Sequence, residues 1–192
     1  MKDKNLLIAV TGGIGSGKST VMKILQSLSY RTISSDKIVS DLYKKRKTKK
    51  LLKALFPTAV TGRLNLKIDR QKIAQEVFSD KEKHQKLTAL ITPMVLDEII
   101  AYHKKVGGVV FAEIPLLFEC KFENAFDKVI VITREKEQRI ASVITRSALS
   151  REEVEARMRA QFDYDSADLS KYVVIENNGN VAELEEKIRS II

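Results

Sequence analysis

The 192-residue sequence contains little of several residue types, and each scarcity excludes a class of protein. With one cysteine, Cys120, it cannot form an internal disulfide or a cysteine-based zinc site, and His84 and His103 are too few for a histidine-rich metal centre. Its 8 glycines and 3 prolines are too few for a collagen-like or low-complexity chain. No apolar run approaches the ~18 residues of a membrane span, and residues 6–10 are too short for a signal-peptide core. We therefore expect a folded cytoplasmic protein with no membrane partner.

Basic residues outnumber acidic ones, 34 to 25, which gives a formal net charge of +9. Such an excess favours polyanionic partners: nucleic acid, an anionic membrane or a small phosphorylated molecule. Seven of the basic residues lie between Lys44 and Lys53, in a run that contains no acidic residue. Two interpretations of this run stay open. It is either a solvated helical face or a positive surface that attracts an anionic substrate.

Short apolar runs alternate with helical patterns along much of the chain. Residues 5–11 (NLLIAVT) form a continuous apolar run that ends in glycines, which is typical of a strand buried on both faces of a parallel sheet. The spacing of an amphipathic helix follows at Val21, Ile24, Leu25 and Leu28. Further strands are predicted at residues 30–34, 109–114, 128–133 and 172–176. This alternation predicts an α/β, doubly wound domain with about five mainly parallel strands.

Residues 12–19 read GGIGSGKS and match the pattern G-x-x-x-x-G-K-[ST]. The motif follows a buried-strand pattern and opens an amphipathic helix, which is the context that a phosphate-binding loop requires. Its glycines let backbone N–H groups point inward, and the helix N-terminus adds positive potential toward bound phosphates. Lys18 is then expected at the β- and γ-phosphates of a nucleotide and Ser19 at Mg²⁺. The alternative is a glycine-rich turn with a surface lysine.

Two stretches are too long for simple connections between parallel strands. From residue 35 to about residue 105 the periodicity is helical and no strand is predicted, which indicates a helical insertion. Residues 135–166 are also helical, and they divide at Ser150, where Glu153 completes a capping-box-like start; we predict a mobile lid. A closing helix is predicted at residues 181–192. The predicted domains are a nucleotide-binding core (1–35, 107–134 and 167–192), a helical acceptor-substrate domain (36–106) and a lid (135–166).

The phosphate-binding motif leaves the second substrate open. The sequence lacks the N-K-x-D and D-x-x-G segments of a regulatory GTPase. Asp36 stands at the carboxyl end of the second predicted strand, where ligands bind in open α/β sheets, so its carboxylate is expected to face the phosphate site. Its alternative role is the N-cap of the next helix.

Landmarks spread from residue 9 to residue 179 resemble the dephospho-CoA kinase family. They are residues 9–20 (AVTGGIGSGKST), Asp36, Asp69-Arg70 with Val77-Phe78, residues 113–119 (EIPLLFE), Arg146, residues 150–153 (SREE) with Arg157 and Gln161, and residues 177–179 (NNG). The family uses ATP to phosphorylate the ribose 3′-hydroxyl of dephospho-CoA, the last step of coenzyme A biosynthesis. The resemblance implies a P-loop nucleotide-kinase fold with helices on both faces of the sheet, a helical substrate-binding insertion and a lid.

The resemblance also implies roles for individual residues. Asp36 matches the proposed base near the attacking hydroxyl, Arg70 matches an arginine associated with the acceptor, and Arg146 matches a lid arginine at the transferring phosphoryl group. The alternative for Arg70 is an arginine on the surface of a helix. Glu113 stands where the family usually has Asp and would hold a water bound to Mg²⁺, whereas Ser19 would bind the metal directly. The predicted ATP-binding residues are Gly13, Ile14, Gly15, Ser16, Gly17, Lys18, Ser19, Thr20, Asn178 and Gly179. Asn177, Asn178 and Gly179 would frame the adenine, and the alternative is a plain turn after the last strand. The predicted acceptor site contains Thr11, Asp36, Arg70, Leu116 and Glu119, and the predicted catalytic residues are Asp36, Lys18 and Arg146.

Three positions depart from the family pattern. Ser34 replaces a common acidic residue, Thr92-Pro93 stands where His-Pro is usual, and Ser142 occupies the place of a second lid arginine. Arg139 precedes Arg146 by seven residues, so at ~3.6 residues per turn it lies on nearly the same helix face and is a candidate substitute. Two other functions stay open: another P-loop kinase of small metabolites, and a nucleic-acid-binding protein that uses the basic run. The favoured prediction is a monomer or weak homo-oligomer that acts on dephospho-CoA and does not bind nucleic acid.

Overall fold

The computed structural model describes residues 5–192 and divides the chain into two compact units. One unit contains residues up to Ser34 together with His103–Ile192, and the other is Ser35–Tyr102. The limits of the second unit lie a few residues from those of the predicted acceptor domain, whose binding role stays a prediction. Within the part of the chain that the structure describes, no helix has both the length and the apolar character needed to cross a membrane.

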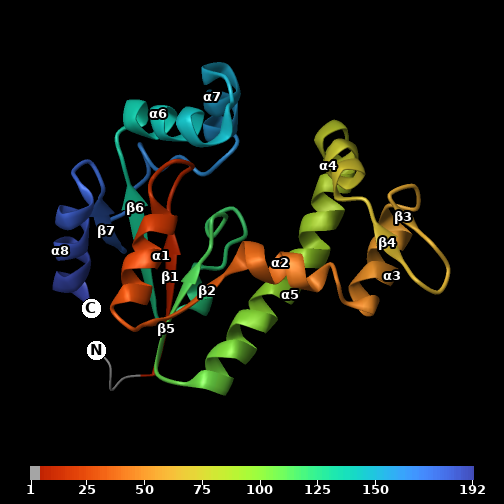
Figure 1. Cartoon of the computed structure of the whole chain (residues 1–192), viewed down its shortest axis with the longest axis horizontal. Coiled ribbons are helices and arrows are strands. Elements are labelled where there is room, and N and C mark those ends of the chain that lie inside the picture. The colour runs from red at the N-terminus through yellow and green to blue at the C-terminus, as the bar shows by residue number, and fades with distance from the viewer. Residues whose placement is uncertain (1–4) are drawn as a thin grey trace. The chain divides into compact units, whose positions relative to one another are not determined.

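The first unit is built on a five-stranded sheet in which all strand pairs are parallel (Figure 1). Its strands, in spatial order, are β2 (Arg31–Ser34), β5 (Val109–Glu113), β1 (Leu6–Thr11), β6 (Lys128–Thr133) and β7 (Val173–Glu176). The α/β prediction with about five mainly parallel strands is therefore confirmed. Because the strands run parallel, their carboxyl ends meet at one edge of the sheet, which is where ligands bind in such folds.

One face of this sheet is covered by α1 (Lys18–Ser27) and α8 (Val181–Ile191), which share an apolar core with the strands (Figure 1). The predicted stripe on α1 is buried there at Val21, Ile24 and Leu25. Leu184 and Ile188 of α8 enter the same cluster, beside Ile8 and Val10 of β1 and Ile130 and Ile132 of β6. This core packs α1 against β1, and so positions the loop of residues 12–17 that joins them.

Helices α6 (Lys136–Ser147) and α7 (Arg151–Arg159) occupy the region predicted as a lid. The capping box is confirmed: the Ser150 hydroxyl accepts from the Glu153 N–H, and the Glu153 carboxylate accepts from the Ser150 N–H. The prediction of helix up to residue 166 is wrong, because α7 ends at Arg159. Beyond it, Asp163 accepts backbone hydrogen bonds from Asp165 and Ser166, and these local bonds favour a turn over another helical turn.

The second unit contains α2 (Ser35–Leu42), α3 (Arg46–Leu55), α4 (Arg70–Ser79) and most of α5 (Lys81–Val106). The prediction that this region has no strand is wrong: β3 (Val60–Thr61) and β4 (Lys67–Ile68) form an antiparallel hairpin. Each strand has only two residues, so no alternation of apolar and polar residues reveals it. Gly62 turns the chain at φ +89°, a conformation that glycine adopts without strain.

The basic run forms the turn before α3 and most of α3 itself. Thr48 and Leu52 are buried, whereas Arg46, Lys47 and Lys50 point to solvent. Lys44 pairs with Asp41, and Lys45 pairs with Glu98. An exposed basic face agrees with both interpretations of the run, so the choice between them stays open. The short connection η1 (Glu123–Ala125), which precedes β6 in the first unit, completes the described elements.

Candidate active site

Residues 12–19, which comprise the loop between β1 and α1 and the first two residues of α1, are called here the phosphate loop. Three of its glycines have positive φ, +147° at Gly12, +77° at Gly15 and +99° at Gly17, which L-residues with a side chain rarely adopt. Gly17 is the N-cap of α1, and it offers no side chain to the N–H groups of the first turn. That turn also contains no acidic residue. The start of α1 therefore presents unshielded N–H groups and positive potential, the features of an anion site.

Side chains of the loop add to this anion site. Lys18 is half-buried, and its Nζ donates to the carbonyl oxygens of Gly12 (2.7 Å) and Gly13 (3.0 Å), so its charge is held over the loop. The Ser16 hydroxyl is buried and has no hydrogen-bond partner among residues 5–192. A buried hydroxyl of this kind suits a phosphate oxygen as acceptor. Ser19 is exposed in the first turn of α1, where its hydroxyl is accessible to a metal ion.

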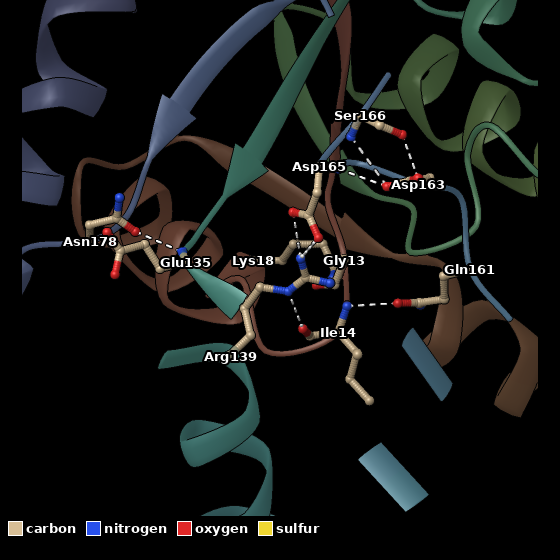
Figure 2. Close-up of polar contacts among 10 residues, drawn as sticks. All are labelled: Gly13, Ile14, Lys18, Glu135, Arg139, Gln161, Asp163, Asp165, Ser166 and Asn178. Atoms are coloured by element: carbon tan, nitrogen blue, oxygen red, sulfur yellow. Dashed lines mark hydrogen bonds and ion pairs between the residues drawn. The ribbon is translucent and has the colours of Figure 1, made fainter. Parts of the chain in front are cut away.

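The residues after β7 hold the phosphate loop and the start of α6. Asn177 is buried, and its Nδ2 donates to the Ser16 carbonyl oxygen at 2.8 Å. A Cβ at Gly17 would lie 2.2 Å from this Nδ2, so only glycine fits beside it. Asn178 Oδ1 accepts from the Glu135 N–H at 2.9 Å (Figure 2), and Gly179 is exposed. The predicted adenine-binding pair thus lies at the amino end of α6, while the structural role of Asn177 was not predicted.

A second group of side chains contacts the phosphate loop from the α6–α7 region (Figure 2). Gln161 Oε1 accepts from the Ile14 N–H at 2.7 Å, and Arg139 Nε donates to the Ile14 carbonyl oxygen at 3.2 Å. Arg139 Nη1 also donates to both carboxylate oxygens of Asp165, at 3.0 and 3.2 Å. Asp163 shapes the neighbouring turn: the Ser166 hydroxyl and the N–H groups of Asp165 and Ser166 lower the pKa of its carboxyl.

A cavity of about 470 Å³ opens beside these contacts. Its lining mixes three cationic and three anionic side chains with apolar and aromatic ones, and consists of Lys136, Arg139, Glu155, Met158, Arg159, Gln161, Phe162, Asp163, Tyr164 and Asp165. The cavity is therefore not a simple anion pocket, although it adjoins the phosphate loop through Arg139 and Gln161.

The predicted acceptor residues of the first unit gather at the carboxyl ends of β1 and β5. The Thr11 side chain is fully buried and shares a 3.0 Å hydrogen bond with the Tyr164 hydroxyl. Burial raises the pKa of Tyr164 to about 12. Leu116 is 47% exposed, and Glu119 Oε1 accepts from the Phe162 N–H at 2.8 Å. The structure thus brings these residues to one edge of the sheet, with the Thr11 hydroxyl already paired.

Glu113 ends β5 and is half-buried, opposite Ser34 of β2 in the strand register. Asp36 follows the end of β2 by two residues but belongs to the second unit. It is exposed in the first turn of α2, which begins at Ser35, so the alternative role of Asp36 as N-cap is wrong. A carboxylate in the first turn still interacts favourably with the helix dipole.

Arg70 opens α4 in the second unit, where Asp69 caps the helix by accepting from the Lys72 N–H. Arg70 Nη2 donates to the carbonyl and hydroxyl oxygens of Ser40, both at 3.2 Å, and its guanidinium lies 5.2 Å from the ring centroid of Tyr43. Burial raises the pKa of Tyr43. These contacts fix the arginine between α2 and α4.

The two arginines of α6 have different environments. Arg139 is 4% exposed against the phosphate loop, whereas Arg146 is exposed in the last turn. Ser142 lies between them and is exposed. The contacts of Arg139 were not predicted, although the sequence did mark it as a candidate substitute.

The chain is similar to known proteins over almost its whole length. The family model described as dephospho-CoA kinase matches residues 6–183. A dephospho-CoA kinase from Thermus thermophilus is 36% identical over 188 residues, covering 97% of this chain and 90% of the relative. Another, from Fusobacterium nucleatum, is 33% identical over 184 residues, covering 95% of each chain.

Solved structures are also similar to this chain over most of its length. A Thermus thermophilus structure superposes with a TM-score of 0.85 at 35% identity and covers 98% of this chain and 96% of its own. Dephospho-CoA kinase from Campylobacter jejuni gives a TM-score of 0.69 at 29% identity, with 96% and 94% covered. Shikimate kinase from Acinetobacter baumannii, at 18% identity and a TM-score of 0.57, shares the fold alone. The family model matches nearly the whole sequence, and the chain has the phosphate loop described above. The chain therefore belongs to the dephospho-CoA kinase family.

Proposed function

We propose that the protein transfers the γ-phosphoryl group of ATP to the ribose 3′-hydroxyl of dephospho-CoA, which yields coenzyme A. The observation that carries this proposal is the phosphate loop: unshielded N–H groups at the start of α1, a lysine held over the loop and an unpartnered buried hydroxyl at Ser16. Family membership over residues 6–183 supplies the acceptor.

The donor side of the reaction rests on residues 13–20. Backbone N–H groups and the start of α1 bind the phosphates, and Lys18 brings positive charge to the β- and γ-phosphates, where negative charge develops during transfer. Asn178 and Gly179 are assigned to the adenine. Arg146, exposed on α6, is assigned to the transferring phosphoryl group, because a planar guanidinium suits its equatorial oxygens.

Mg²⁺ fits the residues present. Within residues 5–192, no group of three or more His, Cys, Asp and Glu side chains is arranged to hold a metal ion. Mg²⁺ commonly keeps several waters and binds substrate phosphates with few protein ligands, and the exposed Ser19 hydroxyl supplies one ligand, with Glu113 acting through water. When bound, Mg²⁺ neutralises charge on the β- and γ-phosphates.

On the acceptor side, Asp36 is assigned as the base that orients the 3′-hydroxyl and accepts its proton. Binding of dephospho-CoA is assigned to Arg70 and to the residues at the carboxyl ends of β1 and β5, which are Thr11, Leu116 and Glu119. A small phosphorylated substrate, and not nucleic acid, is then the partner that accounts for the basic charge. We also assign the protein to the cytoplasm, as a monomer or weak homo-oligomer.

The test is an ADP-release assay with ATP and Mg²⁺, with and without dephospho-CoA, followed by mass analysis of the product. The proposal expects ADP release that depends on dephospho-CoA and a product one phosphate heavier than the acceptor. A panel of other small hydroxyl acceptors shows the specificity. Turnover with another acceptor, and none with dephospho-CoA, would overturn the proposal.

Lys18→Ala tests the donor site directly. Loss of a donor aimed at developing charge should lower kcat by about 10²–10³-fold. Lys23→Ala is the matched control, because Lys23 is an exposed lysine of the same helix. Activity of Lys18→Ala equal to that of the control would contradict the assigned role.

A further inference from the structure

The tip of the phosphate loop is held at one residue by side chains from the α6–α7 region. We infer that Arg139, Asp165 and Gln161 are positioning residues that hold Ile14, and with it the phosphate loop, in the shape that binds the nucleotide. This inference rests on the proposed function, because it concerns how the same loop is prepared for ATP.

Both backbone polar groups of Ile14 are taken by side chains. Its N–H donates to Gln161 Oε1 at 2.7 Å, and its carbonyl oxygen accepts from Arg139 Nε at 3.2 Å. A rotation of the peptide planes on either side of Ile14 would break one of these bonds. The two side chains therefore fix the orientation of the backbone where the loop turns (Figure 2).

The loop needs such a constraint because of its composition. Ile14 stands between Gly13 and Gly15, and glycine loses more conformational freedom on ordering than any other residue. If the loop were disordered without nucleotide, ATP binding would carry this entropic cost. Side-chain contacts that order the loop beforehand remove that part of the cost, which is how preorganisation raises affinity.

Arg139 is itself fixed by a partner. Its side chain is 5% exposed, and a buried guanidinium is stable only when it is paired. The Asp165 carboxylate, at 3.0 and 3.2 Å from Nη1, is that partner. A chain of contacts thus runs from Asp165 through Arg139 to the Ile14 carbonyl oxygen. Asp165 is therefore expected to act on the loop through Arg139.

Helix α6 also lies unusually close to the loop. A Cβ at Gly13 would lie 2.5 Å from Arg139 Nη2, and a Cβ at Gly15 would lie 2.5 Å from the Arg139 backbone oxygen. The Ile14 side chain packs against the cluster of Ile140, Val143 and Val154, which joins α6 to α7. The backbone of α6 therefore requires glycine at position 15, whereas a side chain at position 13 would displace the Arg139 guanidinium.

The experiment measures the Kd of ATP by calorimetry without acceptor, and kcat and KM separately, for Arg139→Gln, Asp165→Ala, Gln161→Ala and the double variant Arg139→Gln/Asp165→Ala. Loss of one ordering hydrogen bond should weaken ATP binding by about 3- to 10-fold in each single variant. KM for ATP should rise more than kcat falls. The matched controls are Arg189→Gln, from an exposed ion pair on α8, and Asp168→Ala, an exposed aspartate of the same segment.

The Asp165→Ala variant separates positioning from direct phosphate contact. If Arg139 acts by holding Ile14, Asp165→Ala weakens ATP binding as Arg139→Gln does, and the double variant is no weaker than Arg139→Gln. Asp165→Asn retains an oxygen acceptor for Nη1 and should recover most of the parent affinity. If Arg139 instead contacts the phosphates, freeing it from Asp165 leaves ATP affinity unchanged or stronger, which overturns the inference.

Two further outcomes are decisive. A lower melting temperature with the parent's Kd for ATP, at a temperature where the variants are folded, would show a purely structural role and overturn the inference. Should Arg139→Gln fail to fold, Gln161→Ala and Asp165→Ala decide the question, since Asp165 is 58% exposed. If the parent shows no turnover with dephospho-CoA while the variants bind ATP more weakly, the proposed function fails and the inference stands.

Discussion

Replacing Asn177 with alanine removes the hydrogen bond that holds the Ser16 carbonyl of the phosphate loop. Asn177 Nδ2 lies 2.8 Å from that oxygen, Asn177 is 8% exposed and Ser16 is fully buried, so water cannot readily replace the donor. A buried carbonyl left without its partner destabilises the protein by about 1–3 kcal/mol. In a chain of this length, each kcal/mol lowers Tm by roughly 2–4 °C, so we expect a fall of about 2–12 °C.

The same bond orders the residue before the N-cap Gly17, so its loss should also weaken ATP binding. Asn177→Asp should be worse than Asn177→Ala in both respects, because an ionised carboxylate cannot donate to the Ser16 carbonyl and repels the phosphates. Thermal melting gives the stability, and calorimetry gives the Kd for ATP. Asn124→Ala, at an exposed asparagine in η1, is the control. If Asn177→Ala melts and binds ATP as the parent does, the reasoning is refuted.

Three other changes test separate features. Asp36→Asn removes the base and should lower turnover by about 10²-fold or more, with ATP affinity preserved; normal turnover would show that Asp36 serves only its helix. Because burial raises the pKa of Tyr164 from 10.0 to about 12, its contribution to stability is complete below pH 10 and is lost as pH rises toward 12. In denaturant titrations at several pH values, Tyr164→Phe should reduce the fall in the free energy of unfolding between pH 10 and pH 12. If the free energy falls as steeply as in the parent, Tyr164 is not the group responsible. Replacing Lys47, Lys49 and Lys50 with Gln should weaken the dependence of kcat/KM on salt concentration. The difference should be clearest in dilute buffer, because screening acts over ~8 Å at physiological salt. If kcat/KM keeps the parent's salt dependence, the basic run is a solvated face.

Much of the core could be predicted because its signals are local. The run at residues 5–11, the glycine motif and the stripe at Val21, Ile24 and Leu25 follow one another without a gap, and each reflects burial of a single strand or helix. Parallel pairing follows from the alternation of strands and helices. The β3–β4 hairpin was missed because two-residue strands carry no periodicity.

The residues around the phosphate loop show a different limit. Gly12–Ser19 identify a phosphate site from their own spacing, but nothing in that spacing names Gln161 or Asn177 as partners of the loop. Gln161 and Asn177 were both visible only as family landmarks, with no contact to the loop predicted for either. The segment after α7 was predicted as helix, although its aspartate-rich turn places Asp165 against Arg139.

By itself, the sequence determined the α/β class and the phosphate loop, because strand burial, helix amphipathicity and glycine spacing act over a few consecutive residues. It indicated the family through its resemblance at landmarks from residue 9 to residue 179. Only the tertiary structure decided how the loop is held. The bonds from Gln161 to Ile14 and from Asn177 to Ser16 join residues 147 and 161 positions apart in the sequence. These partners are far apart along the chain, and bringing them together costs conformational entropy. The bonds therefore form only when the parallel sheet has brought the end of β7 and the α6–α7 region to the carboxyl end of β1.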